Sequence, residues 1–126
     1  KDGLWEGHSI LDVATPASFQ RNPTLVNNFY NQRRSQILCG AVHPNLARTA
    51  VAEFETNFNG SFNLVTQNVG GLHQRAGSVL PIHIHGSLLQ AKCCLCGQAF
   101  GIRTDLDHRE TYARCKKAGA LMLDIV

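Results

Sequence analysis

The sequence predicts an α/β fold, with part of a Rossmann-like parallel sheet, a helical segment before it and a small zinc-ribbon-like module after it. Two apolar stretches, SFNLVTQNV and VLPIHIH, are typical of buried strands. The piece GGLHQRAG between them is typical of a tight turn with a short helix, and four of the five cysteines follow the second stretch. Because ligands of open α/β sheets bind beyond the carboxyl ends of the strands, the polar residues at those ends form the candidate site.

Two helices are expected before the sheet. Residues 1–21 show no clear periodicity and predict an irregular segment with one helical turn near residues 10–13. Asn22 and Pro23 then form an N-cap and first helical position, and the helix they start is expected to stop at Gly40. A second helix is expected from Pro44 to just before the turn-forming NFNGS, with its apolar stripe in the core.

The whole chain, residues 1–126, is predicted to be one domain in three segments. Residues 22–57 form the helical segment, residues 61–90 the Rossmann strands and residues 91–120 the zinc-ribbon-like module. The final GALMLDIV predicts the start of another strand.

Composition excludes several classes of function. Of the 126 residues 44% are hydrophobic and 17% charged, and the formal charge of +3 is scattered along the chain, so no nucleic acid partner is expected. No window approaches eighteen apolar residues and KDGLWEGHS lacks a secretory pattern, so no membrane association is expected. An odd number of clustered cysteines favours reduced thiols inside a cell.

An ordered series of motifs resembles the sirtuins, the NAD-dependent protein lysine deacylases. TQNVGGLHQRAG is followed by IHIHGS and then by a Cys-x-x-Cys, and the earlier GLWEGHSILDVATPASF and NPTLVNNFYNQRR are also similar to stretches of that family. The family's glycine-rich phosphate-binding loop would precede Lys1 and its remaining Rossmann strands would follow Val126. We therefore expect the chain to be an internal fragment.

The resemblance implies a site for NAD at Gln67, Asn68, Val69, Gly70 and His85. Amide side chains donate and accept hydrogen bonds without charge, which suits ribose hydroxyls and a nicotinamide amide. The resemblance makes His85 the general base and Asn68 a second catalytic residue, while the alternatives are amides that cap a strand and a satisfied core histidine. His83 is expected to be such a core histidine, on the same strand face as His85. Sirtuins usually carry an aspartate where this chain has Gly70.

Three cysteines have the spacing of zinc ligands. Cys93 and Cys96 form a Cys-x-x-Cys knuckle, and Cys115 follows at a spacing typical of the second half of a zinc ribbon. The fourth position is Ala118, so Cys94, His108 or a water would have to complete the site, and free buried thiols are the alternative. By resemblance a bound Zn²⁺ has a structural role.

Tyr30 and Arg33 are three residues apart and face the same way on the first predicted helix. A guanidinium and a phenol together suit a carboxylate. FYNQRR resembles the acyl-pocket helix of sirtuins that prefer succinyl, malonyl and glutaryl lysine. The alternative is an aromatic side chain at the edge of the core beside a solvated arginine.

The resemblance thus implies a deacylase that transfers an acyl group from lysine to ADP-ribose and releases nicotinamide, either as a desuccinylase and demalonylase or as a deacetylase. Its partners would be proteins with acylated lysines, in the cytoplasm of a bacterium or in a mitochondrion. A different class of function also fits: a catalytically inactive remnant that serves as a zinc-ribbon or peptide-binding module.

Overall fold

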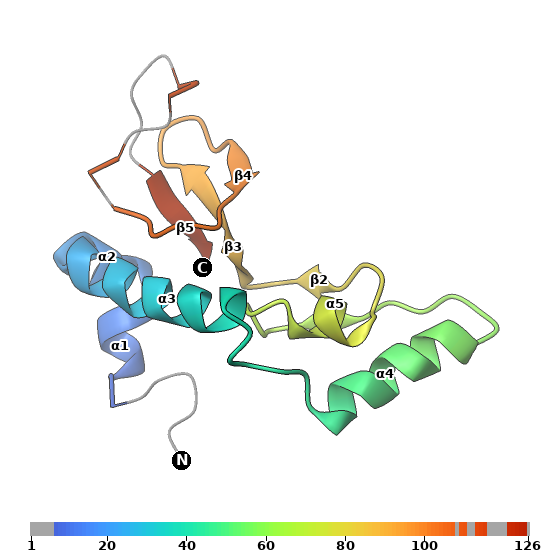
Figure 1. Cartoon of the computed structure of the whole chain (residues 1–126). Coiled ribbons are helices and arrows are strands. Elements are labelled where there is room, and N and C mark those ends of the chain that lie inside the picture. The colour runs from blue at the N-terminus through green and yellow to red at the C-terminus, as the bar shows by residue number, and fades with distance from the viewer. Residues whose placement is uncertain (1–6, 108, 111–112, 116–120, 126) are drawn as a thin grey trace.

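The chain folds into three connected parts (Figure 1). A computed structural model describes residues 7–107, 109–110, 113–115 and, for the backbone alone, 121–125. Helices α1 to α3 pack together, a three-stranded sheet lies against α3, and an arm made of α4, α5 and a two-stranded sheet extends away from both. The arrangement confirms the predicted α/β class.

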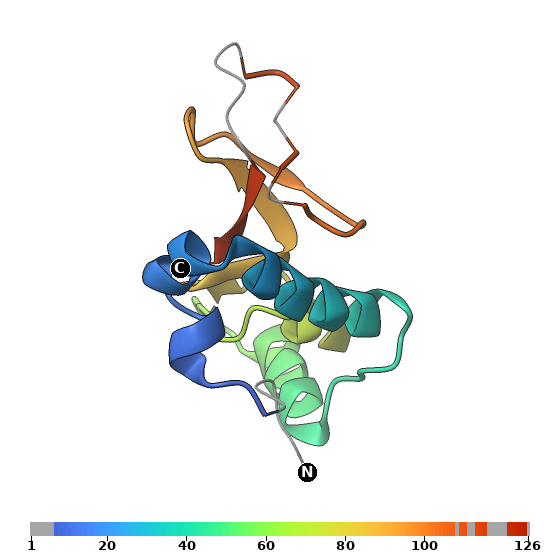
Figure 2. The same ribbon diagram turned by 90° about the vertical axis from the view of Figure 1, so that its left-hand side faces the viewer.

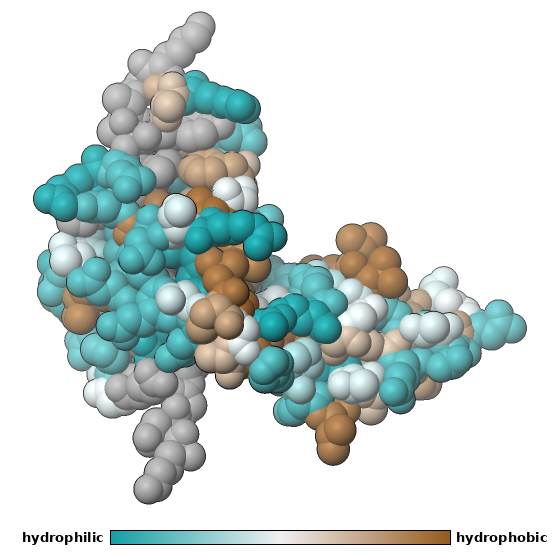
Figure 3. Space-filling model, in the orientation of Figure 1, coloured by the Kyte–Doolittle hydropathy of each residue, from teal (hydrophilic) through white to brown (hydrophobic). Residues whose placement is uncertain are grey.

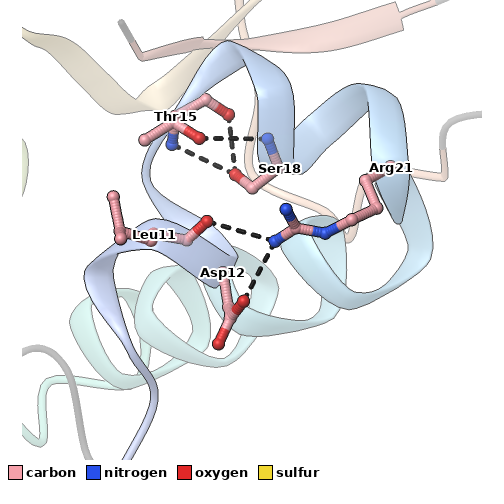
Figure 4. A network of polar contacts seen from close by, with 5 residues as sticks. All are labelled: Leu11, Asp12, Thr15, Ser18 and Arg21. Carbon is pink, nitrogen blue, oxygen red and sulfur yellow. Dashed lines mark hydrogen bonds and ion pairs between the residues drawn. The ribbon is translucent and has the colours of Figure 1, made fainter.

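Two short helices open the described part, α1 (Ile10–Val13) and α2 (Pro16–Arg21). The sequence predicted the turn at α1 but not α2, whose start is a capping box: the Ser18 amide donates to Thr15 Oγ1 at 3.0 Å, and the Thr15 amide donates to Ser18 Oγ at 3.1 Å. Arg21 then ties α2 to α1, donating to Asp12 at 2.9 Å and to the Leu11 carbonyl at 3.2 Å (Figure 4).

Helix α3 (Pro23–Leu38) confirms the first predicted helix. The Asn22 side chain accepts a hydrogen bond from the Leu25 amide at 3.0 Å, and Pro23 occupies the first turn, where its missing N–H costs nothing. Much of the helix is buried, including polar positions: Val26, Asn27, Phe29, Tyr30, Asn31, Arg33, Arg34 and Ile37.

Helix α4 (Leu46–Asn57) is where the sequence prediction was wrong about packing. It begins at Leu46 rather than Pro44, because the Asn45 side chain caps it by accepting from the Arg48 amide at 3.1 Å. Its apolar stripe does not form core: Leu46 is 88% exposed and Phe54 53% exposed. Figure 3 shows this arm extending from the body, so little of the chain covers its surface.

The predicted parallel strands are present but short. Strand β1 (Val65–Thr66) pairs in parallel with β2 (Ile82–His83), so that Thr66 lies opposite His83. Between them runs α5 (Leu72–Ala76), as predicted for GGLHQRAG. The glycine just before this helix, Gly71, has φ +64°, a left-handed conformation that other residues rarely adopt.

A three-stranded antiparallel sheet follows, in the order β4-β3-β5 (Figure 2). Its strands are β3 (Gly86–Cys93), β4 (Ala99–Gly101) and β5 (Leu121–Ile125). Strand β5 confirms the strand predicted at GALMLDIV. Strands β3 and β4 were not predicted, because burial in β3 does not alternate: Leu88, Ala91 and Cys93 are its buried residues.

The core lies between α3 and β3, and buried polar groups join its two sides. Arg34, 1% exposed, donates through Nε to the Leu88 carbonyl at 2.7 Å and through Nη1 to Asn31 Oδ1 at 2.6 Å and the Thr104 carbonyl at 3.1 Å. Asn31 also exchanges two hydrogen bonds with the Leu106 backbone, at 3.0 and 3.1 Å. Among the described residues, no helix has both the length and the apolar character needed to cross a membrane.

Candidate functional site

The backbone that carries Gln67 and Asn68 is fixed at the carboxyl end of β1. The Asn68 amide donates to Thr66 Oγ1 at 3.0 Å, and the Leu88 amide donates to the Val69 carbonyl at 2.9 Å. The Gln67 and Asn68 side chains are exposed, and no hydrogen bond to another described residue occupies either amide group. Two uncommitted amides on a rigid segment are therefore available to a ligand.

Both histidines of IHIHGS differ from their predicted placement. His85 lies in the turn at residues 84–85 between β2 and β3, so it does not share a strand face with His83. The turn arises because Gly86 adopts φ +75° and redirects the chain into β3. His85 is exposed to solvent.

His83 is not a core histidine, since its side chain is only partly buried. Its Nδ1 lies 2.7 Å from the Asn68 carbonyl oxygen, and its Nε2 lies 2.7 Å from Gln74 Nε2 on α5. This link between His83 and the candidate site was not predicted from the sequence. The signal that could have revealed it is the parallel register, which places His83 beside Thr66 and so next to the TQN segment.

Val69 and Gly70 join the candidate site to the core. The Val69 side chain is 8% exposed and belongs to the same hydrophobic cluster as Ile37. A Cβ added at Gly70 would lie 3.2 Å from Ile37 Cδ1, which is tighter than an ordinary contact. An aspartate at position 70 therefore requires Ile37 to shift by a few tenths of an ångström.

A neighbouring histidine is held neutral. Burial lowers the pKa of His73, and the nearby Arg48 and His83 lower it further. Its Nδ1 is buried and has no hydrogen-bond partner in the described part of the chain. His73 thus lies beside the site as an uncharged ring near neutral pH.

Tyr30 and Arg33 lie together on α3, and both are 4% exposed. The Arg33 guanidinium carbon lies 3.7 Å from the centroid of the Phe29 ring, and Arg33 Nη1 donates to the Phe29 carbonyl at 3.2 Å. Burial raises the pKa of Tyr30, although the adjacent Arg33 opposes the rise. The structure thus places a neutral phenol beside a cation fixed by stacking, and excludes the solvated arginine of the alternative interpretation.

The three cysteines predicted as metal ligands come together. The Sγ atoms of Cys93, Cys96 and Cys115 all lie within 4.8 Å of one another. Cys94 is not in this group, and the predictions for His108 and Ala118 concern residues outside the part of the chain that the structure describes. The spacing fits three ligands of one tetrahedral ion, whose Zn–S bonds are about 2.3 Å long.

The ionisation of Cys93 also suits a metal ligand. Burial acts to raise the pKa of this thiol, but hydrogen bonds from the Cys96 and Leu95 backbone and from the Cys96 and Cys115 side chains lower it to about 7. A cysteine binds a metal ion as the thiolate, so the thiol must first lose its proton. A lowered pKa reduces the free-energy cost of that loss.

Comparison with known proteins gives consistent matches. The model of the Sir2 family matches residues 1–126. The chain is 43% identical to an NAD-dependent protein deacylase of Vibrio cholerae and 45% identical to one of Bdellovibrio bacteriovorus, in each case over all of this chain and over 51% and 54% of the relative. It therefore spans about half the length of these curated relatives.

Solved structures agree with the sequence matches. The chain resembles a mutant Sir2 homologue in complex with ADP-ribose, with a TM-score of 0.81, 35% identity, and coverage of 100% of this chain and 49% of that one. It also resembles a Sir2 homologue in complex with NAD, with a TM-score of 0.80, 33% identity, and coverage of 100% and 48%.

Proposed function

This chain belongs to the Sir2 family, and from that premise we propose that the protein is an NAD-dependent protein lysine deacylase. One observation carries the proposal. The uncommitted amides of Gln67 and Asn68 extend from a rigid segment at the carboxyl end of β1, where ligands of α/β sheets bind. His85 follows the neighbouring strand. The relatives that share the whole of this chain carry the same name, deacylase.

Each residue has a role that its chemistry suits. The Gln67 and Asn68 amides hydrogen bond to ribose hydroxyls and to the nicotinamide amide, and so orient NAD. NAD, when bound, supplies the ribose carbon that receives the acyl oxygen. The His85 imidazole would take a proton from a ribose hydroxyl, because an unprotonated ring nitrogen can act as a general base. Cys93, Cys96 and Cys115 would hold a structural Zn²⁺.

The test is release of nicotinamide from NAD in the presence of an acyl-lysine peptide. Loss of a general base lowers turnover by about 10² to 10⁴-fold, so His85→Ala should fall by that factor. His43→Ala is the matched control, because His43 is an exposed histidine on the loop before α4. The proposal fails if His85→Ala retains the activity of the His43→Ala variant.

A second candidate is an inactive member of the family that binds peptides. Gly70 favours it, because sirtuins usually carry an aspartate there and glycine offers no carboxylate to the nicotinamide. Calorimetric titration with NAD separates the candidates. Heat of binding that disappears in Asn68→Ala supports the enzyme, whereas peptide binding without any NAD binding supports the inactive module.

The acyl preference is a finer part of the proposal. We assign the acyl carboxylate of succinyl or malonyl lysine to Tyr30 and Arg33. Stacking on Phe29 fixes the guanidinium before a ligand arrives, and the protonated Tyr30 hydroxyl is a donor.

Removing this pair should change selectivity. Arg33→Met removes a charge-assisted hydrogen bond worth about 1.5 to 3 kcal/mol, so kcat/KM for a succinyl peptide should fall by roughly tenfold or more. An acetyl peptide should be affected little, since it has no carboxylate. Equal losses on both peptides would mean that Arg33 supports the fold and would refute the desuccinylase assignment.

Substrates and location follow from the same proposal. The partners are proteins with acylated lysines. The relatives at 43% and 45% identity come from bacteria, which favours the bacterial cytoplasm over the mitochondrion.

A further inference from the structure

We propose that His83 is a positioning residue of this site, one that fixes the peptide group carrying Asn68 and thereby the direction of the two amide side chains. The inference rests on the proposed function. It assigns His83 no contact with NAD or with the acyl-lysine. Its effect on the reaction is transmitted through Asn68.

The bonding of the ring fixes its tautomer. A carbonyl oxygen can only accept, so His83 Nδ1, 2.7 Å from the Asn68 oxygen, must carry a proton and donate it. His83 Nε2, 2.7 Å from the amide nitrogen of Gln74, then accepts from that NH₂ group. With these partners the ring donates from Nδ1 and accepts at Nε2, and it links the end of β1 to helix α5.

The Asn68 backbone is therefore held from both ends. Its N–H donates to Thr66 Oγ1 at 3.0 Å, and its carbonyl accepts from His83. Thr66 and His83 are themselves paired across the parallel strands. One pair of facing residues thus fixes both hydrogen-bonding groups of Asn68.

This support matters because Gln67 and Asn68 gain no rigidity from their own side chains, which are exposed. Without the His83 bond, the peptide between Asn68 and Val69 loses one of the restraints on its rotation. A displacement of about 1 Å in a positioning group can cost roughly a hundredfold in rate.

Two substitutions distinguish the contributions of the two ring nitrogens of His83. In His83→Asn the side-chain amide nitrogen takes the place of Nδ1, so the bond to the Asn68 carbonyl can be kept while the Gln74 bond is lost. In His83→Gln the side-chain amide reaches the place of Nε2, so the Gln74 bond can be kept while the Asn68 bond is lost. Each variant thus serves as the control for the other.

The experiment measures kcat and KM for nicotinamide release in the wild type and in both His83 variants. The melting temperature of each protein is measured alongside. We expect His83→Asn to stay within about threefold of wild type and His83→Gln to lose about tenfold to a hundredfold in kcat/KM. The two variants should melt at similar temperatures. In the wild type, ¹⁵N spectra of the His83 ring should report the tautomer protonated on Nδ1.

Three results would overturn the inference. They are equal losses in both variants, losses that follow the melting temperature, and a His83 ring protonated on Nε2 alone. A wild-type protein without NAD-dependent nicotinamide release overturns the proposed function itself, and the inference with it. An active wild type in which His83→Asn and His83→Gln behave alike overturns the inference alone.

Discussion

Replacing Arg34 by methionine tests how α3 is held to the rest of the chain. The substitution keeps an unbranched side chain and removes three hydrogen bonds from a charged donor, at 2.7, 2.6 and 3.1 Å. Burial lowers the pKa of Arg34, so part of the gain is offset by the cost of burying the charge. Removing one member of a buried charged network typically costs about 3 to 5 kcal/mol. Here the Leu88 and Thr104 carbonyls lose their Arg34 donor, whereas Asn31 Oδ1 keeps the Leu106 amide.

The assay is urea unfolding followed by circular dichroism, and Arg21→Met is the matched control. Arg21 also donates hydrogen bonds, to the Asp12 carboxylate at 2.9 Å and to the Leu11 carbonyl at 3.2 Å, but the Arg21 and Asp12 side chains are both more than half exposed. Such a surface pair contributes about 0 to 1 kcal/mol. With an m-value of about 1.5 kcal/mol per molar urea, Arg34→Met should lower the midpoint by about 2 to 3 M and Arg21→Met by well under 1 M. Equal shifts in the two variants would refute the reasoning.

Three further outcomes are expected. The pKa of His73 is lower in the folded than in the unfolded chain, so the unfolded chain binds more protons as the pH falls. The free energy of unfolding should therefore be at its full value above a pH of about 6.5 and decrease below it. Melting curves of His73→Gln should show a weaker dependence on pH. Cys96→Ser should lower the zinc content measured after purification, whereas Cys94→Ser should not. An equal zinc content in the two variants would exclude the three-cysteine site. Gly70→Asp should raise nicotinamide release while lowering the melting temperature, because Ile37 must move; Gly70→Ala should show the same loss of stability without the gain in activity.

Local signals predicted the helices best. The Asn22–Pro23 start of α3 could be predicted because a cap is satisfied within one turn of helix, by the Leu25 amide. The apolar face of α4 could not be assigned correctly, since periodicity reports that a face is apolar but not that any part of the chain covers it. Its residues Leu46 and Phe54 are exposed.

The candidate site was predicted residue by residue, but its internal bonding was not. The sequence placed Gln67 and Asn68 at the carboxyl end of a strand, as in the structure, but it placed His85 on the second strand, whereas His85 lies in the turn after β2. The role of His83 depends on which residue faces it across β1 and β2, and that register comes from the folded sheet. The burial of Arg33 also escaped prediction, because an arginine on an otherwise amphipathic helix is usually solvated.

The hydrogen bonds between Asn31 and Leu106 join residues 75 positions apart. Closing a loop of that length costs roughly 4 kcal/mol of chain entropy, so this contact cannot lead folding. During synthesis, α3 leaves the ribosome long before its partners at Thr104 and Leu106 exist. Until then Asn31 has only water and Arg34 for hydrogen bonding, and of the Arg34 partners outside α3 only the Leu88 carbonyl has been synthesised. The helical segment can therefore form early, but its docking must wait for translation to pass residue 106.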